Sequence, residues 1–512
     1  MLVKSYAAAV QGISATIVTI EVNCTKGIQF FLVGLPDVAV RESHERIISA
    51  LQVSGYKFPR SRIVINMAPA DIRKEGSSYD LPLAIGILAA AEEVDASRLD
   101  KFMMMGELSL DGSLQPIKGA LPIAIKAREE GFKGFIVPKQ NAREAAVVNE
   151  LEVYGVSTIK EVIEFIAGKR QLEPTIVNTR EEFYARQLQF DVDFSDVRGQ
   201  ENVKRAMEVA AAGGHNLLLI GPPGSGKSML AKRLPSILPP FTLQESLETT
   251  KIHSVAGKIG VETALMTQRP FRSPHHTISN VAMVGGGAYP QPGEISLAHN
   301  GILFLDELPE FNRNVLEVMR QPLEDRMITV SRARSTVEYP ASFMLVASMN
   351  PCPCGYYNHP DRPCLCSPGV VQKYMNRVSG PLLDRIDIQV EVVPVPFEKI
   401  SEQRPSEPST AVRERVVRAR SVQELRFASC EGVYCNAQMS SRLLHQYAVP
   451  DMAGLALLKT AMQRLSLSAR AYDRILKVSG TIADLEASPN IEVRHLAEAI
   501  NYRNLDRETW GQ

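Results

Sequence analysis

The segment from Leu217 to Ser228 constrains the fold of this chain more than any other. Residues 217–220 are apolar and predict a short buried strand, residues 221–228 read GPPGSGKS, and a helical pattern begins at Met229. A strand, a G-x-x-x-x-G-K-[ST] loop and a helix in direct succession are typical of a P-loop. Its glycines let backbone N–H groups converge on phosphate oxygens. The sequence therefore predicts an α/β domain that binds a nucleoside triphosphate.

The loop also assigns roles to individual side chains. Lys227 is expected to reach the β and γ phosphates, and the Ser228 hydroxyl is expected to ligate Mg²⁺. The cofactors that follow are ATP and Mg²⁺. The residues predicted to hold the phosphates are Gly221, Pro222, Pro223, Gly224, Ser225, Gly226, Lys227, Ser228 and Met229.

Two further predicted strands end in polar residues suited to the same chemistry. Residues 301–305 run into Asp306 and Glu307, at the carboxyl end of a buried strand, where α/β sheets bind ligands. Asp306 is expected to hold Mg²⁺ directly or through water, and Glu307 to polarise the attacking water. Residues 342–348 end near Asn350, whose amide is expected to sense the γ-phosphate, although a turn Asn before a proline is the alternative. Together these motifs predict ATP hydrolysis.

Changes in composition divide the 512 residues into candidate domains. Residues 1–168 alternate β-rich runs with helical patterns and predict an α+β domain. The polar residues 169–193 predict a linker, part of which could be helical. Residues 194–396 predict the α/β domain with the P-loop. Residues 397–512 begin with a linker that is rich in Pro, Ser and Glu. The rest of this segment has apolar residues at helical spacing and predicts a helical domain.

The overall composition argues against a globally basic nucleic-acid-binding protein and against a membrane or secreted protein. Lys and Arg total 57, as do Asp and Glu, so the net charge is +0 and any polyanion site must be a local patch. The longest apolar run, residues 81–91, is too short to span a bilayer. The first residues lack the apolar core of a signal peptide, so we expect a cytoplasmic protein with reduced thiols and no membrane partner.

Four of the seven cysteines form a C-x-C pair, nine intervening residues and a second C-x-C pair: Cys352, Cys354, Cys364 and Cys366. Four thiolates complete a tetrahedral Zn²⁺ site, and a metal could fold this turn-rich segment. Four reduced thiols without metal are the competing interpretation, because C-x-C is a less usual spacing than C-x₂-C. His359 is an alternative ligand. A closed shell of four ligands favours a structural metal over a catalytic one.

The segments around the P-loop resemble those of AAA+ ATPases, in the magnesium-chelatase-like branch and within it the ComM/YifB family. They are residues 269–279 (RPFRSPHHTIS), 285–287 (GGG), 292–299 (PGEISLAH) and 381–387 (PLLDRID). The resemblance covers nearly the whole chain. It implies a P-loop AAA+ module, a Lon-protease-like N-terminal domain and a helical C-terminal lid. It also implies a homo-hexameric ring with nucleotide between subunits.

The resemblance further assigns an arginine that a neighbouring subunit contributes to each site, where it stabilises charge on the transferred phosphoryl group. Arg385 is that arginine by resemblance, and Arg377 is a second candidate. A salt bridge from Arg385 to Asp384 or Asp387 is the alternative.

Two more sites follow from the same resemblance. Arg470 resembles the sensor-2 arginine that opens a lid helix, and Arg474, one turn on, is its alternative. Val197 and Gln200 occupy the place where this class packs adenine.

Residues 73–80, 106–112, 116–119 and 136–140 resemble the protease domain of Lon. Lon uses a Ser–Lys pair in which the lysine is the base. Ser78 falls at the serine position, but Ile123 occupies the lysine position. We therefore expect a non-catalytic scaffold. A dyad rescued by another lysine stays open, the candidates being Lys74, Lys118 and Lys126.

Two insertions in the predicted ATPase module carry basic residues. Residues 251–287 include Arg269 and Arg272, and a second segment includes Arg332 and Arg334. Six copies facing a pore would give a positive channel for DNA. Solvated loops, or bridges between subunits, are the competing interpretation.

Three functions remain open at this point. The favoured one is a DNA motor, a helicase or branch-migration factor acting on single-stranded or branched DNA, as the family's role in natural transformation and recombination implies. The second is a chelatase-type ATPase that remodels a protein partner. The third is a Lon-like ATP-dependent protease.

Overall fold

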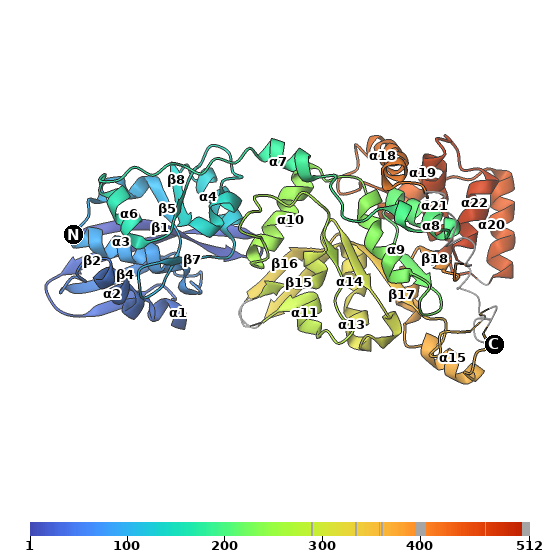
Figure 1. Cartoon of the computed structure of the whole chain (residues 1–512), viewed down its shortest axis with the longest axis horizontal. Helices are drawn as coiled ribbons and strands as arrows, with labels where there is room; N and C mark the ends of the chain where they lie inside the picture. Colours follow the sequence, from blue (N-terminus) through green and yellow to red (C-terminus); the bar gives the residue numbers. More distant parts are fainter. Residues whose placement is uncertain are drawn as a thin grey trace.

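The computed structural model describes residues 1–287, 290–332, 335–357, 359, 362–395, 406–465 and 467–503. The molecule is elongated, with an N-terminal lobe at one end and the C-terminal helices at the other (Figure 1). Arg334 lies outside the described residues, and so does the side chain of Arg332.

The N-terminal lobe is built on a seven-stranded sheet of order β3-β4-β2-β1-β5-β8-β9. Its strands are β1 (Leu2–Gln11), β2 (Ser14–Thr25), β3 (Phe30–Val33), β4 (Arg62–Ala68), β5 (Phe102–Met104), β8 (Gly134–Pro138) and β9 (Glu152–Val156). A small ribbon pairs β6 (Glu107–Leu108) with β7 (Leu114–Gln115). The helices are α1 (Val38–Arg41), α2 (Ser43–Val53), α3 (Asp80–Ala90), α4 (Ala120–Glu129), α5 (Ala142–Ala145) and α6 (Ile159–Ile166).

Helix α3 accounts for the longest apolar run of the sequence. Every residue of this helix is buried, and it packs against β1 and β2. This helix has no polar face because it is buried on all sides in the core of the N-terminal lobe. Of the helices in the described part of the chain, none has the length and hydropathy to cross a bilayer.

The predicted linker carries a short helix, α7 (Thr179–Arg186), seen between the lobes in Figure 1. Phe183 is buried in the N-terminal core, and Arg143 donates to Glu182 at 2.7 Å. Phe183 thus anchors this otherwise polar segment to the lobe, together with the partly buried Leu172 and Val177.

The second sheet has five strands in the order β11-β14-β17-β10-β18, and all its pairs are parallel. The strands are β10 (Leu217–Ile220), β11 (Phe271–Arg272), β14 (Ile302–Leu305), β17 (Met344–Met349) and β18 (Ile388–Glu391). Two ribbons are β12 (Gly285–Gly286) with β13 (Gln291–Pro292), and β15 (Met327–Arg332) with β16 (Ser335–Pro340). The P-loop strand β10 thus lies beside β17, and β14 follows on the other side of β17.

The helices around this sheet are α8 (Glu201–Gly213), α9 (Lys227–Arg233), α10 (Leu243–Val255), α11 (Asn280–Val284), α12 (Glu294–Leu297), α13 (Arg313–Val318), α14 (Arg320–Asp325), α15 (Pro368–Met375) and α16 (Gly380–Leu383). Short 3₁₀ turns lie at Ser77–Tyr79, Phe194–Asp196, Leu234–Ile237 and Leu308–Glu310, among others.

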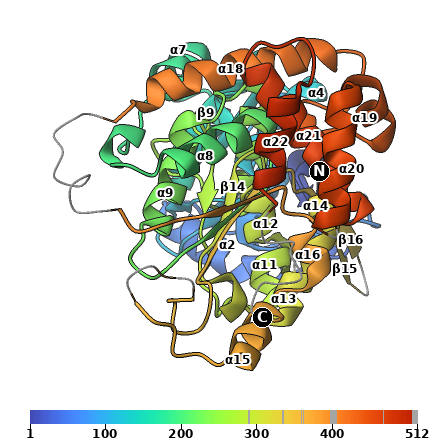
Figure 2. The same ribbon diagram turned by 90° about the vertical axis from the view of Figure 1, so that its right-hand side faces the viewer.

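The C-terminal helices are α18 (Ser409–Arg426), α19 (Ser441–Tyr447), α20 (Met452–Arg464), α21 (Ala469–Leu485) and α22 (Val493–Asn501). Figure 2 faces this group, with α8 beside it. Its apolar side chains share one core with α8 and the P-loop sheet, as shown by Ala206, Val416 and Ile475. The sequence predicted the helices, but not that their core is continuous with that of the sheet.

Helix α10 joins the two lobes. Its Ser254 carbonyl accepts from Gly119 at 3.0 Å, and its Ser254 hydroxyl accepts from Leu121 at 3.4 Å, at the start of α4. Phe241 and Leu265, on either side of α10, are buried in the N-terminal core. Part of the basic insertion of residues 251–287 therefore docks on the N-terminal lobe.

Asp387 ties the C-terminal helices to the P-loop sheet. Its side chain is 1% exposed and accepts from His215 at 3.1 Å and Arg474 at 2.8 Å. Burial raises the pKa of Asp387, but Arg474 and His215 lower it more, so the net pKa is well below its ordinary value. Because the folded pKa is depressed, the stabilisation is present at neutral pH and is lost as the pH falls through that pKa.

We expect Asp387→Ala to lower the free energy of unfolding by about 3–5 kcal/mol, because it leaves the buried His215 and the partly buried Arg474 without their carboxylate. Urea unfolding at pH 7 measures the effect. Asp384→Ala is the control, because that side chain is 34% exposed and lies 3.8 Å from Arg470. A cost below about 1 kcal/mol is expected for the control. Equal costs for both variants would contradict the role of Asp387.

Candidate nucleotide-binding site

The P-loop follows β10 directly and turns through two glycines with left-handed backbone, Gly224 (φ 80°) and Gly226 (φ 89°). A side chain at either position would strain this conformation. Among the described residues, the buried Ser225 hydroxyl has no hydrogen-bond partner. A buried hydroxyl inside a glycine-shaped turn fits a bound phosphate, which would supply the missing acceptor.

Lys227 lies inside the loop. Its Nζ donates to the carbonyls of Gly221 at 2.7 Å and Pro222 at 2.9 Å, and to Asn350 Oδ1 at 3.2 Å. Burial lowers the pKa of Lys227, and the nearby charges of Asp306 and Glu307 partly offset this. The structure thus brings together Lys227 and Asn350, two predicted site residues from distant parts of the chain.

Asp306 lies at the end of β14, within reach of two hydroxyls. Ser228 Oγ donates to its Oδ2 at 2.6 Å, and Ser348 Oγ donates to its Oδ1. A carboxylate beside a hydroxyl offers the hard oxygen ligands that Mg²⁺ prefers. The sequence predicted Ser228 and Asp306 but missed Ser348, whose place beside Asp306 depends on the pairing of β17 with β14.

Glu307 follows with a left-handed backbone at φ 55° and a side chain that is 58% exposed. Its carboxylate lies 3.5 Å from His276 Nδ1. An exposed carboxylate next to the Mg²⁺-ligating position can reach water, as a general base must. The His276 contact was not predicted, because it joins two loops that are distant in sequence.

Arg385 is held within its own subunit. Its Nη1 donates to the Pro381 carbonyl at 2.5 Å and its Nη2 to Glu324, and the side chain is 8% exposed. The expected alternative partners were Asp384 and Asp387, but the partner is Glu324. Arg377 is more exposed and donates to both carboxylate oxygens of Glu310 at 2.9 Å.

The two sensor-2 candidates differ in their surroundings. Arg470 is 65% exposed near the start of α21, 3.8 Å from Asp384. Arg474 is bonded to the buried Asp387. Arg474 therefore links the lid to the sheet, and Arg470 is the more accessible of the two.

The two residues predicted to pack adenine have different surroundings. Val197 is buried, and Gln200 Nε2 donates to the Val393 carbonyl. A Cβ atom at Gly221 would lie 2.3 Å from the Val392 carbonyl, so the segment that Gln200 contacts also passes against the first glycine of the P-loop. The adenine contact itself stays a prediction.

The two described DNA candidates have carboxylate partners inside the module. Arg269 contacts Glu245 at 3.0 Å through both terminal nitrogens, and Arg272 contacts Glu294 at 2.6 and 2.7 Å. Binding DNA through either guanidinium would require it to exchange partners.

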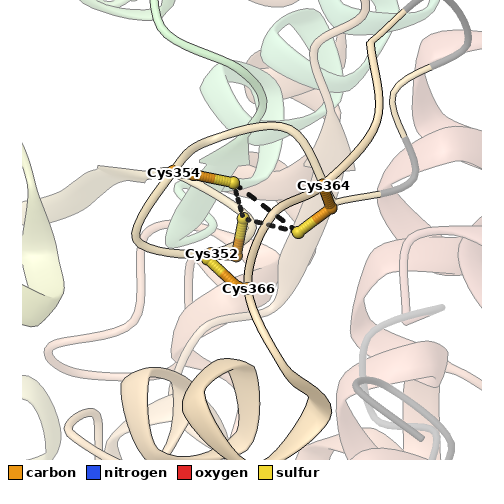
Figure 3. Close-up of side chains that lie close together, drawn as sticks. All are labelled: Cys352, Cys354, Cys364 and Cys366. Atoms are coloured by element: carbon orange, nitrogen blue, oxygen red, sulfur yellow. Dashed lines mark hydrogen bonds between the residues drawn. The ribbon is translucent and has the colours of Figure 1, made fainter.

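The four predicted thiols converge, as Figure 3 shows. The Sγ atoms of Cys352 and Cys354 are 3.3 Å apart, and each lies 3.7 or 3.6 Å from that of Cys364. All four sulfurs, including Cys366, lie within 4.8 Å of one another. Zinc–sulfur bonds of about 2.3 Å in a tetrahedron place the sulfurs about 3.8 Å apart, so the residues fit this ion.

The thiols of this cluster differ in acidity. Burial raises the pKa of Cys354, but the backbone N–H groups of Tyr356 and Leu365 and the neighbouring thiols lower it further, to about 6. A thiolate, the form that binds metal, is therefore present at neutral pH.

The N-terminal lobe offers no matching base for Ser78. Ile123 is buried in α4, Lys74 is buried and donates to the Pro69 carbonyl, and Lys126 pairs with Glu130 at 2.7 Å. Lys118 lies against Gly257. In the described part of the chain, the Ser78 hydroxyl has no hydrogen bond to a lysine.

A parallel sheet with a P-loop, an Asp–Glu pair on a second strand and an Asn on the strand between them defines the chain as a P-loop ATPase of the AAA+ class. Family models agree with this class. Residues 193–400 match "Magnesium chelatase, subunit ChlI", residues 20–141 match "Subunit ChlI of Mg-chelatase", and residues 406–503 match "Magnesium chelatase, subunit ChlI C-terminal".

Individual relatives narrow the class to a family. Competence protein ComM of Haemophilus influenzae is 44% identical over 505 residues, 98% of this chain and 97% of that protein. The YifB protein of Escherichia coli is 45% identical over 507 residues, covering 98% and 96%. The chain belongs to the ComM/YifB family of magnesium-chelatase-like ATPases. Lon protease 2 of Bacillus subtilis is 30% identical over 125 residues, 24% of this chain and 22% of that protein.

Proposed function

We propose that this ATPase assembles into a hexameric ring and uses ATP hydrolysis to move along DNA, as a helicase or branch-migration factor. The observation that carries the proposal is the 44% identity, over 98% of the chain, to a protein named for competence. The family has a role in natural transformation and recombination, and by resemblance this role points to single-stranded or branched DNA as the substrate.

The positive charges near the nucleotide site support a ring in which a neighbouring subunit completes the site. Lys227 is the cation bonded to the P-loop carbonyls, whereas Arg385 and Arg377 are bonded to carboxylates of their own subunit. A second cation from a neighbour would stabilise the charge that develops on the transferred phosphoryl group. We propose that Arg385 of the adjacent subunit supplies it after leaving Glu324, with Arg377 as the alternative.

The cofactors follow from the side chains already described. Mg²⁺ would be held by Ser228 and Asp306, and when bound it neutralises charge on the phosphates. Lys227 would hold the triphosphate, Asn350 would orient it, and Glu307 would accept a proton from water. We propose that Cys352, Cys354, Cys364 and Cys366 bind a structural Zn²⁺.

The test is an ATPase assay without DNA and with single-stranded, duplex and branched DNA. We expect at least one DNA form to raise the rate about tenfold or more, a coupling of the size typical between two sites. Strand displacement should accompany the stimulation and disappear in Lys227→Ala. Equal rates without DNA and with each of the three DNA forms would contradict the DNA proposal while leaving the ATPase assignment intact.

The second candidate is a remodelling ATPase that acts on a protein partner. The matches of residues 193–400 and 406–503 to the chelatase subunit favour it. Stimulation by a protein partner, with no response to DNA, would support this candidate. A Lon-like protease has less support, because Ile123 stands at the position of the base, and it would require peptide cleavage that is lost in Ser78→Ala.

A further inference from the structure

The four-cysteine cluster is joined directly to the nucleotide site through the chain. Strand β17 ends at Met349, Asn350 contacts Lys227 at 3.2 Å, and Cys352 follows two residues later. Cys352 is the buried member of the cluster. Whatever holds Cys352 in place therefore also restrains the amide that lies beside the P-loop lysine.

A second contact connects the cluster to the P-loop itself. Gly355, next to Cys354, is buried and has a left-handed backbone at φ 83°. A Cβ atom built on Gly355 would lie 2.4 Å from Cδ and 3.0 Å from Cγ of Pro223. The cysteine loop thus passes against the P-loop at a distance that only glycine permits, next to the Pro222 carbonyl that accepts from Lys227.

The far end of the cysteine loop is anchored as well. Cys366 is followed by Ser367, the first flanking residue of α15. Val371 and Tyr374 of this helix are buried, and Tyr374 packs in the core that contains Met349. The described parts of the loop are therefore held at both ends by the ATPase core, and the four cysteine sulfurs converge between these ends.

We propose that a zinc ion on Cys352, Cys354, Cys364 and Cys366 braces the nucleotide site, so that metal loading sets its affinity for nucleotide. The ion would keep Gly355 against Pro223 and Asn350 against Lys227. Without it, this turn-rich loop must be ordered when nucleotide binds, and that ordering costs affinity. The inference rests on the proposed zinc and nucleotide sites.

The first test compares ADP binding to the full chain by calorimetry before and after zinc removal with a chelator under reducing conditions. We expect one zinc per chain as purified, binding about tenfold weaker after removal, and recovery when zinc is returned. Unchanged affinity in the metal-free protein, or the absence of stoichiometric zinc, would overturn the inference. If untreated protein binds no nucleotide, the assignment of the P-loop site fails instead.

A second test leaves all four thiols in place. Gly355→Ala pushes the loop away from Pro223, and we expect unchanged zinc content with ADP binding at least about fivefold weaker. Gly131→Ala is the matched control, because its φ of 78° imposes the same backbone strain and a Cβ there meets nothing within 4 Å. Thermal unfolding of both variants checks the fold. Equal ADP affinity in the two variants would overturn the contact between the loop and the P-loop.

Discussion

Replacing Glu307 by glutamine is expected to slow ATP hydrolysis by about 10²–10⁴-fold while ATP binding is retained. Glutamine keeps the shape of the side chain but cannot accept a proton from water. The carboxylate is exposed next to Asp306, and it lies 3.5 Å from His276 Nδ1, so the substitution disturbs little of the fold. Phosphate release measures the rate, and calorimetry with ATP measures binding.

Glu317→Gln is the control for this variant. Glu317 lies on α13 in the same module and pairs with Arg320 at 2.7 Å. Its ATPase rate should stay within about twofold of wild type, because removing a partly exposed ion pair changes stability by only about 1 kcal/mol. Hydrolysis that persists in Glu307→Gln would assign the proton acceptor to another residue.

The site residues that the structure brings together, as the sequence predicted, are those whose place follows from a local pattern. A strand followed by GPPGSGKS, and a strand followed by Asp306 and Glu307, place polar groups at the carboxyl edge of one sheet, because parallel strands end at the same edge. The structure has Asp306 bonded to Ser228 and Lys227 bonded to Asn350. The four cysteines were likewise predicted to cluster, because they all lie within residues 352–366, and their sulfurs do converge.

The residues that the sequence missed depend on pairings between distant segments. Ser348 reaches Asp306 only because β17 lies beside β14, and serine in a strand carries no signal of such a contact. Glu324 as the partner of Arg385 depends on how α14 and α16 pack. For the basic insertion the sequence left a pore-facing loop, a solvated loop and a bridge between subunits open. The structure adds that Arg269 and Arg272 pair with carboxylates within the module, which loop composition alone cannot reveal.

Replacing Arg385 by alanine is expected to lower ATP hydrolysis by about 10³–10⁵-fold, the usual contribution of an arginine supplied to a phosphoryl-transfer site. Nucleotide binding should persist, because Lys227 and the loop glycines are untouched. The contact between Arg385 and Glu324 gives the same loss of activity a structural explanation, because the variant removes the ion pair between the buried Arg385 and the exposed Glu324. Measuring one variant alone therefore cannot separate a role in the neighbouring site from a role in the fold.

Mixing two inactive proteins separates these explanations. In a ring, a subunit with Arg385→Ala keeps Glu307, and a neighbour with Glu307→Gln keeps Arg385, so their shared interface holds a complete site. An equal mixture of subunits, allowed to exchange, should recover about one quarter of wild-type activity if subunits combine at random. A mixture that stays inactive would place Arg385 in the fold of its own subunit. Recovery in the same experiment with Arg377→Ala would then transfer the role to Arg377.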